Sequence, residues 1–247
     1  MKNKNYRIGS WVTFYHHSIL EIFLLQKNIE FIVIDREHSP ISYLESEIMI
    51  DMIKSRNKKA FVRISSINIT EIKKVLDSGA DGIILPMVKN EKDILQAIDF
   101  AFFPPIGSRS YSLGKCTKYG KNFSNYTKKF NKKFEIIPII EHYQGINNFE
   151  QIVNNKKIKI KTIMVGPYDL SGSLNIPGDF DNKKFKNSMR EIDKLCDKLR
   201  VNKGIHYPLN DKKNLKKLIK SNFRFIAFGM DSQFLLQSLN DTFDKIN

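Results

Sequence analysis

The stretch TIMVGPYDLS at residues 162–171 is an apolar, β-branched run followed at once by a polar turn that carries Asp169. An earlier stretch, EIIPIIEH at residues 135–142, has the same form and places Glu141 at the end of its run. Such runs are typical of strands that are covered on both faces of a parallel sheet. The carboxyl ends of these strands form the active face of an α/β barrel, so acidic residues there indicate a functional site.

Short apolar runs alternate with longer amphipathic segments along the chain, which is the pattern of repeated βα units. We count about eight units, the number that closes a (β/α)8 barrel. The predicted strands cover residues 7–14, 31–35, 60–65, 82–88, 135–141, 162–165, 204–207 and 225–228. The 247 residues match the size of one such barrel. The sequence therefore predicts an α/β protein with a single TIM-barrel domain over residues 1–247.

Several segments between the strands have apolar residues at helical spacing. The clearest predicted helices cover residues 17–27, 69–76, 189–199, 215–219 and 234–243. The alternation breaks at PPIGSRS, residues 104–110, which opens a stretch rich in Gly, Ser, Asn, Tyr and Lys that runs to residue 133. Because long loops in compact domains usually serve a function, we interpret this stretch as a loop over the active face. An ordinary surface excursion is the alternative interpretation.

The net charge of +15 raises the question of a nucleic-acid partner. The lysines are dispersed, however, without zinc-binding spacing and without the aromatic signature of RNA-recognition motifs. We therefore expect a solvated basic surface and no nucleic-acid partner. Cys116 and Cys196 show no CxxC spacing, and no apolar run approaches the roughly 18 residues of a membrane span. These features predict a cytoplasmic protein without a membrane partner.

Ionisable residues also follow two other predicted strands. DREH at residues 35–38 directly follows the run FIVI, and His38 is the natural acid/base candidate because an imidazole titrates near neutral pH. Arg63 lies in the strand FVRIS, where a guanidinium is costly unless an anion pairs with it. Its partner could be a substrate carboxylate or a developing enolate oxygen. A structural salt bridge within the barrel is the alternative for Arg63.

Glu141 and Asp169 supply hard oxygen ligands, which suit Mg²⁺ or Mn²⁺ when water and substrate oxygens complete the coordination. Ordinary salt bridges at the strand ends are the alternative interpretation of this pair. Gly166, Pro167 and Tyr168 separate the strand from Asp169, and backbone N–H groups there could bind a substrate carboxylate.

The motifs resemble those of the metal-dependent 2-oxo acid aldolases of the 4-hydroxy-2-oxoheptanedioate aldolase type. This family includes 2-keto-3-deoxy-sugar-acid aldolases and is related to citrate lyase β-like proteins. The matching segments occur in order along nearly the whole chain: GSWVTF, IDREHSP, FVRIS, LDSGADGIILPMV, PPIGSRSYS, PIIEH, VGPYDLSGSLNIPG and FIAFGMD. The resemblance implies a TIM barrel of the phosphoenolpyruvate/pyruvate type that reversibly cleaves a 4-hydroxy-2-oxo acid into pyruvate and an aldehyde.

The resemblance also implies a cofactor and partners. Glu141 and Asp169 would bind a divalent cation, which would be Mg²⁺, Mn²⁺ or Co²⁺. The backbone of three residues would bind the pyruvate carboxylate: Gly166, Pro167 and Tyr168. The partners would be small-molecule substrates and further copies of the chain in a trimer or hexamer. Residues 234–243 and 110–133 are the candidate contacts between the copies.

The catalytic roles follow from the same resemblance. His38 would be the catalytic base, and Asp77, in LDSGA, would be the acidic partner that orients it. Asp35 would support the same hydrogen-bonding group. Arg63 would stabilise the enolate oxygen that forms when the carbon–carbon bond breaks.

Three positions depart from the family pattern, and we expect them to affect the choice of aldehyde. Arg36 stands where a Gly is usual and would add charge near the aldehyde side. Ile139 stands where a Gln is usual, and His142 replaces a small hydroxyl residue and should point away from the side of Glu141. Two other functions stay open: a related enolate reaction such as acyl-thioester cleavage, and a weakened barrel that acts as a binding or assembly protein.

Overall fold

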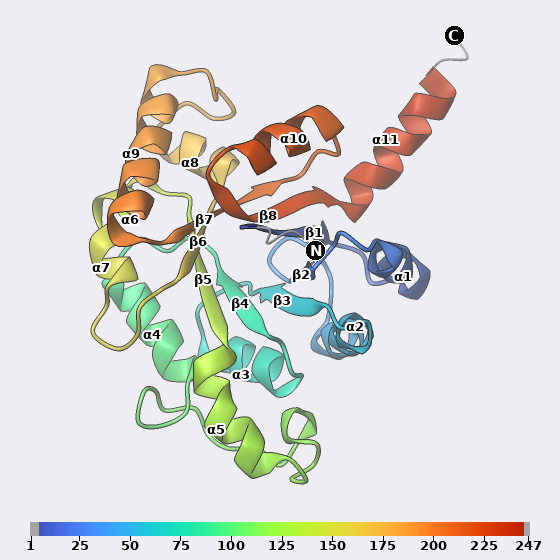
Figure 1. The fold of residues 1–247 in the computed structure, drawn as a ribbon, viewed down its shortest axis with the longest axis vertical. Coiled ribbons are helices and arrows are strands. Elements are labelled where there is room, and N and C mark those ends of the chain that lie inside the picture. Colours follow the sequence, from blue (N-terminus) through green and yellow to red (C-terminus); the bar gives the residue numbers. More distant parts are fainter. Residues whose placement is uncertain (1–4, 245–247) are drawn as a thin grey trace.

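Eight parallel strands form a closed barrel in the computed structural model of the protein, which describes residues 5–244. Each strand pairs with the next, and β1 pairs with β8 to close the barrel (Figure 1). The strands are β1 (Arg7–Val12), β2 (Phe31–Asp35), β3 (Lys59–Arg63), β4 (Gly82–Leu85), β5 (Glu135–Ile140), β6 (Thr162–Val165), β7 (Asn202–Tyr207) and β8 (Phe223–Met230). The predicted (β/α)8 barrel is confirmed. The single domain over residues 1–247 stays a prediction, and its residues 1–4 and 245–247 lie outside the described residues.

Helices connect the strands and surround the barrel (Figure 1). They are α1 (His17–Leu25), α2 (Tyr43–Ser55), α3 (Ile69–Asp77), α4 (Glu91–Ala101), α5 (Phe123–Lys133), α6 (Tyr143–Asn147), α7 (Phe149–Val153), α8 (Pro167–Ser173), α9 (Lys183–Leu199), α10 (Lys212–Lys220) and α11 (Asp231–Phe243), with a 3₁₀ turn, η1 (Lys115–Thr117). The predicted strands differ from the observed ones by at most three residues at either end. None of the helices among residues 5–244 is long and apolar enough to cross a membrane.

Large apolar side chains fill the inside of the barrel. Trp11, Phe31, Phe61 and Phe225 are fully buried there, and the rings of Phe31 and Phe225 stack with their centroids 4.1 Å apart. A larger apolar layer, mostly of Ile, Leu, Val and Phe, packs the strands against the surrounding helices. Because the interior is filled, the barrel is a solid support for a site at its mouth.

A buried carboxylate links the segments that follow the first and the last strand of the barrel. Asp231 follows β8 directly and is 3% exposed. It accepts hydrogen bonds of 2.8 Å from the backbone N–H groups of Thr13 and Phe14 and one of 2.7 Å from the Thr13 hydroxyl. The turn after β1 is thereby held against the start of α11.

The segment between α4 and β5 does not form the loop over the active face that the sequence suggests. It contains η1 and the helix α5, and α5 shares a surface depression with residues 79–81, which directly precede β4. The reason is topological: α4 has already returned the chain to the amino ends of the strands before this segment begins. None of residues 103–133, all within the described range, lines the pocket at the opposite end of the barrel.

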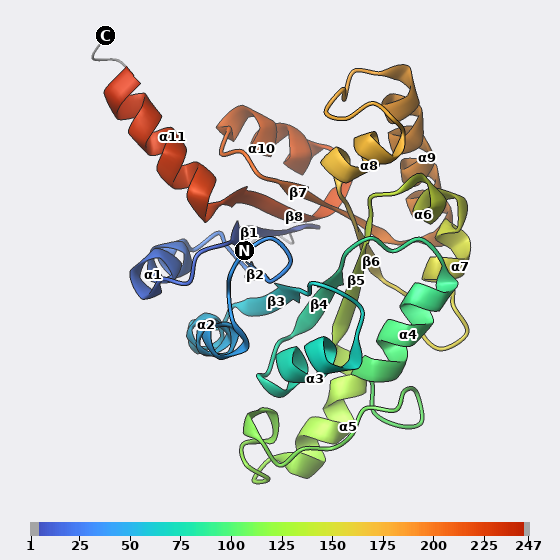
Figure 2. The ribbon, with the colours of Figure 1, turned by 180° about the vertical axis from the view of Figure 1, so that it is seen from behind.

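The last helix leaves the barrel instead of covering it. Figures 1 and 2 both show α11 extending away from the strands and the other helices. Among its described residues only Asp231 is buried. The helix carries five exposed apolar side chains: Phe234, Leu235, Leu236, Leu239 and Phe243.

Candidate active site

A pocket of about 240 Å³ lies at the carboxyl ends of the strands. Every predicted site residue except Asp77 lines it or forms its rim: Asp35, His38, Arg63, Glu141, Gly166, Pro167, Tyr168 and Asp169. The chain brings these residues together because β2, β3, β5 and β6 all end at this mouth. In α/β barrels this end carries the active site.

Arg63 is held by two carboxylates of the β2 strand end. Its Nε and one terminal nitrogen bind Asp35 Oδ1 at 3.0 Å and Oδ2 at 2.6 Å, and its other terminal nitrogen lies 2.9 Å from Glu37 Oε2. Burial favours the neutral acid at Asp35, but the hydrogen bonds and charge of Arg63 hold the pKa of that carboxyl below its ordinary value. Burial raises the pKa of Glu37 against the opposing charges of Arg63 and His38. The guanidinium is therefore fixed in one plane beside the pocket.

His38 stands on the loop after β2, and 68% of its side chain is exposed. Its backbone N–H donates to Asp35 Oδ1 at 3.2 Å, so Asp35 supports the loop backbone and not the imidazole. Asp77 lies at the end of α3, towards the amino ends of the strands, where its carboxylate accepts a 2.7 Å hydrogen bond from Arg109. The expected contact between Asp77 and His38 is absent within residues 5–244 of one chain, because α3 separates the two residues by the length of a helix.

Glu141 is a buried carboxylate at the end of β5, with 4% exposure. Its Oε1 accepts a 2.6 Å hydrogen bond from the backbone N–H of Met87. Burial, with the negative charges of Asp169 and Glu37, raises the pKa of Glu141 to about 7 although the Met87 bond opposes the shift. Acidic groups are therefore crowded in a place where a cation would relieve their repulsion.

The donor set suits a divalent cation that keeps part of its water shell. Residues 5–244 contain no group of three or more His, Cys, Asp and Glu side chains arranged for a metal. Mg²⁺ is commonly held by one or two carboxylates, with water and substrate oxygens completing its octahedron. Gly166 fits the same purpose, because a Cβ at this position would lie 2.5 Å from Glu141 Oε2. Glycine thus leaves room for the Glu141 carboxylate beside the first turn of α8, which carries Asp169.

Among the lining residues that the sequence analysis did not single out are Trp11 and His206. The imidazole of His206, on β7, stacks on Trp11 with ring centroids 4.1 Å apart, and its Nε2 is buried without a hydrogen-bond partner among the described residues. Burial and the charge of Arg63 lower the pKa of His206 to about 3. The signal available in the sequence is a histidine at the last position but one of the predicted strand GIHY, residues 204–207.

The structure also places the three departures from the family pattern. Ile139 lines the pocket and forms an apolar part of its wall. His142 points away from the pocket, as expected, and its Nδ1 accepts a 3.2 Å hydrogen bond from the Gln144 N–H at the start of α6. The expectation that Arg36 adds charge on the aldehyde side is wrong. Its guanidinium turns outward from the barrel and pairs with Glu71.

Comparison with known proteins agrees with the geometry. The family model of the HpcH/HpaI aldolase/citrate lyase proteins matches residues 7–238. The chain is 25% identical to a hydroxypyruvate/pyruvate aldolase of Sagittula stellata, over 93% of this chain and 88% of the relative. It is 26% identical to a 5-keto-4-deoxy-D-glucarate aldolase of Shigella sonnei, over 98% and 94% of the two chains.

Solved structures support the fold in the same way. The crystal structure of an HpcH/HpaI aldolase from Desulfitobacterium hafniense superposes with a TM-score of 0.89 at 20% sequence identity, covering 98% of this chain and 92% of that one.

Proposed function

Because the chain belongs to the HpcH/HpaI aldolase/citrate lyase family, we propose that it is a divalent-metal-dependent aldolase. It reversibly cleaves a 4-hydroxy-2-oxo acid into pyruvate and an aldehyde. The observation that carries the proposal is the meeting of a histidine, an arginine and two carboxylates, Glu141 and Asp169, at one pocket at the mouth of the barrel. Within residues 5–244 neither carboxylate forms an ion pair.

His38 is the proposed base. In the cleavage direction the imidazole takes the proton of the 4-hydroxyl, the bond between C3 and C4 breaks, and its electron pair remains on the pyruvate fragment as an enolate. The aldehyde leaves, and the enolate carbon then takes a proton to give pyruvate. The exposure of His38 at the pocket rim suits a group that exchanges protons with substrate and with water.

Arg63 is the proposed stabiliser of the enolate oxygen. The position of its charge is set before the substrate binds, because Asp35 and Glu37 hold the guanidinium from two sides. A preorganised charge of this kind stabilises the transition state without reorganisation during the reaction. Asp35 is thus a support for Arg63 and for the loop that carries His38.

Glu141 and Asp169 would hold the cation. When bound, a divalent cation polarises the keto group and stabilises the negative charge that develops on the pyruvate fragment. The backbone around Gly166, Pro167 and Tyr168 would face the substrate carboxylate, and since Pro167 has no N–H, the donors would be Tyr168 and its neighbours.

The relatives suggest a substrate class. By name, one acts on hydroxypyruvate and pyruvate, and others act on 5-keto-4-deoxy-D-glucarate and 2-keto-3-deoxy-L-rhamnonate. We propose a 2-keto-3-deoxy sugar acid or a similar 4-hydroxy-2-oxo acid for this chain. The pocket retains the base, the arginine and both carboxylates, so a non-catalytic binding protein is not favoured.

The test is pyruvate release from a panel of 4-hydroxy-2-oxo acids, followed with lactate dehydrogenase, in Mg²⁺, Mn²⁺ or Co²⁺ and in excess chelator. We expect release that chelator abolishes and metal restores. Glu141→Gln and Asp169→Asn should each lower both Mn²⁺ affinity and turnover by about a hundredfold or more. Wild-type turnover in either variant would overturn the cation assignment, and no release from any substrate with Mn²⁺ bound would overturn the aldolase itself.

We also propose that the protein is a homo-oligomer, a trimer or hexamer, in which α11 packs against another copy. The support is that α11 exposes Leu235, Leu236 and Leu239 where it extends away from its own barrel, beyond the first turn, in which Phe234 packs on Phe23 of α1. Contiguous exposed apolar surface of this kind marks an interaction site.

A further inference from the structure

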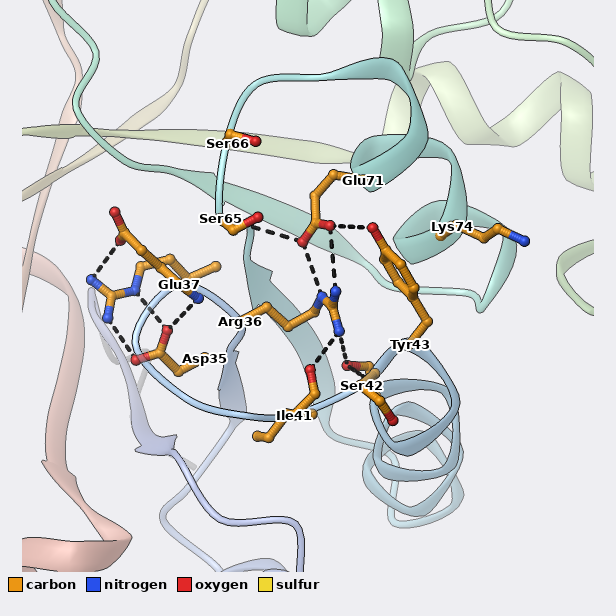
Figure 3. A network of polar contacts seen from close by, with 12 residues as sticks. Asp35, Arg36, Glu37, Ile41, Ser42, Tyr43, Ser65, Ser66, Glu71 and Lys74 are labelled. Carbon is orange, nitrogen blue, oxygen red and sulfur yellow. Dashed lines mark hydrogen bonds and ion pairs between the residues drawn. The ribbon is translucent and has the colours of Figure 1, made fainter.

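A second ionic cluster lies behind the loop that carries His38. Figure 3 shows it: Arg36 Nε lies 3.0 Å from Glu71 Oε1, and a terminal nitrogen of Arg36 lies 3.4 Å from Oε2. The Arg36 guanidinium stacks over the Tyr43 ring at 3.9 Å, and the Tyr43 hydroxyl donates to Glu71 Oε2 at 2.5 Å. Glu71 is 3% exposed, and the Arg36 side chain is 9% exposed. We call Arg36, Tyr43 and Glu71 the outer clamp.

The outer clamp closes the loop between β2 and α2. Arg36 opens this loop, and its other terminal nitrogen donates to the carbonyl oxygen of Ile41, near the loop's end, at 2.6 Å. Tyr43 is the first residue of α2, and Glu71 belongs to the first turn of α3. The Glu71 N–H donates to the Asn68 side chain at 2.8 Å. The clamp therefore fixes the loop to two helices that are themselves capped.

The loop is held from the other side as well. The backbone N–H of Arg36 donates to the carbonyl oxygen of Arg63 at 2.9 Å. Asp35 Oδ1 accepts from the N–H of Glu37 at 2.9 Å and from that of His38 at 3.2 Å. Residues 36–41 are thus fixed on two sides. Asp35 binds their backbone on the side of the pocket, and Arg36 binds on the side of the helices α2 and α3.

The His38 imidazole is the part of the loop that is left free. Within residues 5–244 its charged neighbour is Glu37, at 3.9 Å from Nε2, and no hydrogen bond to its ring is formed. The position of the imidazole above the pocket is therefore set by the loop backbone, which the contacts of Asp35 and of the outer clamp hold in place.

Stability alone is a weak reason for such a cluster. Two charges removed from water lose hydration that their attraction only partly returns, and well-packed apolar residues often replace them without loss. Burial favours the neutral acid, but the hydrogen bonds from Arg36 and Tyr43 keep the pKa of Glu71 below its ordinary value, so the pair is charged at neutral pH. A charged group with several hydrogen bonds fixes the orientation of the side chains and backbone that it joins, whereas an apolar contact does not.

We infer that Arg36, Glu71 and Tyr43 position His38 for proton transfer by fixing the backbone of residues 36–41. Arg36 is the central positioning residue. The inference rests on the proposed aldolase function, in which His38 is the base. Misplacement of a catalytic group by about 1 Å costs on the order of a hundredfold in rate, so a support of this kind belongs to the reaction although it touches no substrate.

The first arm of the test is structural and needs no substrate. Arg36→Gln should speed amide hydrogen exchange of residues 36–42, measured by mass spectrometry, by about tenfold or more. The matched control is Arg7→Gln. Arg7 makes two 2.8 Å bonds to Glu135 and lies over the Phe225 ring at 4.9 Å, but at the opposite end of the barrel. It should leave the exchange of residues 36–42 unchanged. Unchanged exchange in Arg36→Gln would overturn the clamp.

The second arm is kinetic. Arg36→Gln should lower kcat for pyruvate release by about ten- to hundredfold, with KM within about twofold and Mn²⁺ affinity unchanged. Tyr43→Phe, which keeps the ring but removes one hydrogen bond, should cost about two- to threefold. In a His38→Ala background Arg36→Gln should cost less than about twofold, because its effect passes through the imidazole. An equal loss in both backgrounds, or a loss confined to KM, would overturn the positioning role.

The double variant Arg36→Gln/Glu71→Gln guards against misfolding, since it leaves no buried charge unpaired. It should fold, and it should show the same loss of kcat and of exchange protection. If this variant keeps kcat while residues 36–42 lose protection, loop order is not needed for turnover and the inference fails. If wild-type protein releases no pyruvate, the aldolase proposal and the positioning role fail together, and the exchange arm still decides whether the clamp holds the loop.

Discussion

At the scale of single residues, His206 is a titratable group that the fold keeps neutral. Its pKa is lowered from 6.5 to about 3, chiefly by burial and further by the charge of Arg63. Between these two values the unfolded chain binds a proton that the native protein does not. The stability that depends on His206 is therefore fully present above pH 6.5 and falls as the pH is lowered towards 3.

We expect this residue to contribute to acid sensitivity. From pH 6.5 to 5 its share should be about 2 kcal/mol, at about 1.4 kcal/mol per pH unit. His206→Gln should flatten the dependence of the unfolding free energy on pH over this range by that amount, measured by urea denaturation at several pH values. The change of slope is the readout, since lost stacking on Trp11 lowers stability at every pH. Parallel slopes in both proteins would contradict the assignment.

Gly166 offers a second test at this scale. A Cβ there would meet Glu141 Oε2 at 2.5 Å and the Glu141 Cβ at 2.8 Å, whereas a Cβ at Gly172, within the helix α8 that Gly166 precedes, would meet nothing within 4 Å. Gly166→Ala should therefore displace the Glu141 carboxylate and lower Mn²⁺ affinity and turnover by about tenfold or more, the scale of a disturbed ligand environment. Gly172→Ala should leave both unchanged. The two variants are compared by Mn²⁺ titration and pyruvate release.

Residue types at strand ends made most of the site predictable. Glu141 and Asp169 could be placed together because strand ends of a parallel barrel meet at one mouth. The position of Asp77 could not be inferred, because only the length and direction of α3 show that it lies away from His38. The pairing of Arg36 with Glu71 depends on which way the side chain after β2 turns, and a single sequence does not specify that direction.

At the scale of elements, the strands were predictable because most are short runs of apolar residues bounded by polar ones. Helix α5 was missed because FSNYTKKFNKK is mostly polar and only Phe130 among its residues is buried. A signal was present: Phe123, Tyr126 and Phe130 recur at helical spacing. The helix covers the Phe102 and Phe103 rings with Phe130, a small apolar contact that composition alone obscures.

Helix α11 carries the prediction for this scale. Replacing Leu235, Leu236 and Leu239 together by Gln should remove apolar contact between copies and shift the protein towards the monomer, measured by sedimentation velocity. Leu44→Gln, on an exposed position of α2, is the control and should not change the sedimentation coefficient. Because these α11 side chains face solvent within the single chain, helix content should stay the same. An unchanged oligomer would exclude this face as the interface.

At the scale of the whole molecule, the chain carries a net charge of +15, and the proposed substrate is an anion. Attraction between the protein and pyruvate should be screened by salt, because the Debye length falls from about 10 Å at 0.1 M to about 3 Å at 1 M. In the aldol direction, raising NaCl over this range should increase KM for pyruvate by about two- to fivefold. KM for an uncharged aldehyde should not change, which makes it the internal control. Equal effects on both substrates would argue against electrostatic attraction.

The bond between Asp231 and the turn after β1 has a consequence for the order in which the protein is made. Of the eight strands, β1 is synthesised first, yet its second neighbour, β8, is synthesised last. Until β8 is synthesised, β1 therefore presents an open edge, which is a site for wrong pairing with other chains. Asp231 is the residue next in line after β8, and its carboxylate reaches back to Thr13 and Phe14. The residue that fixes β8 beside β1 is thus synthesised immediately after the strand that closes the barrel.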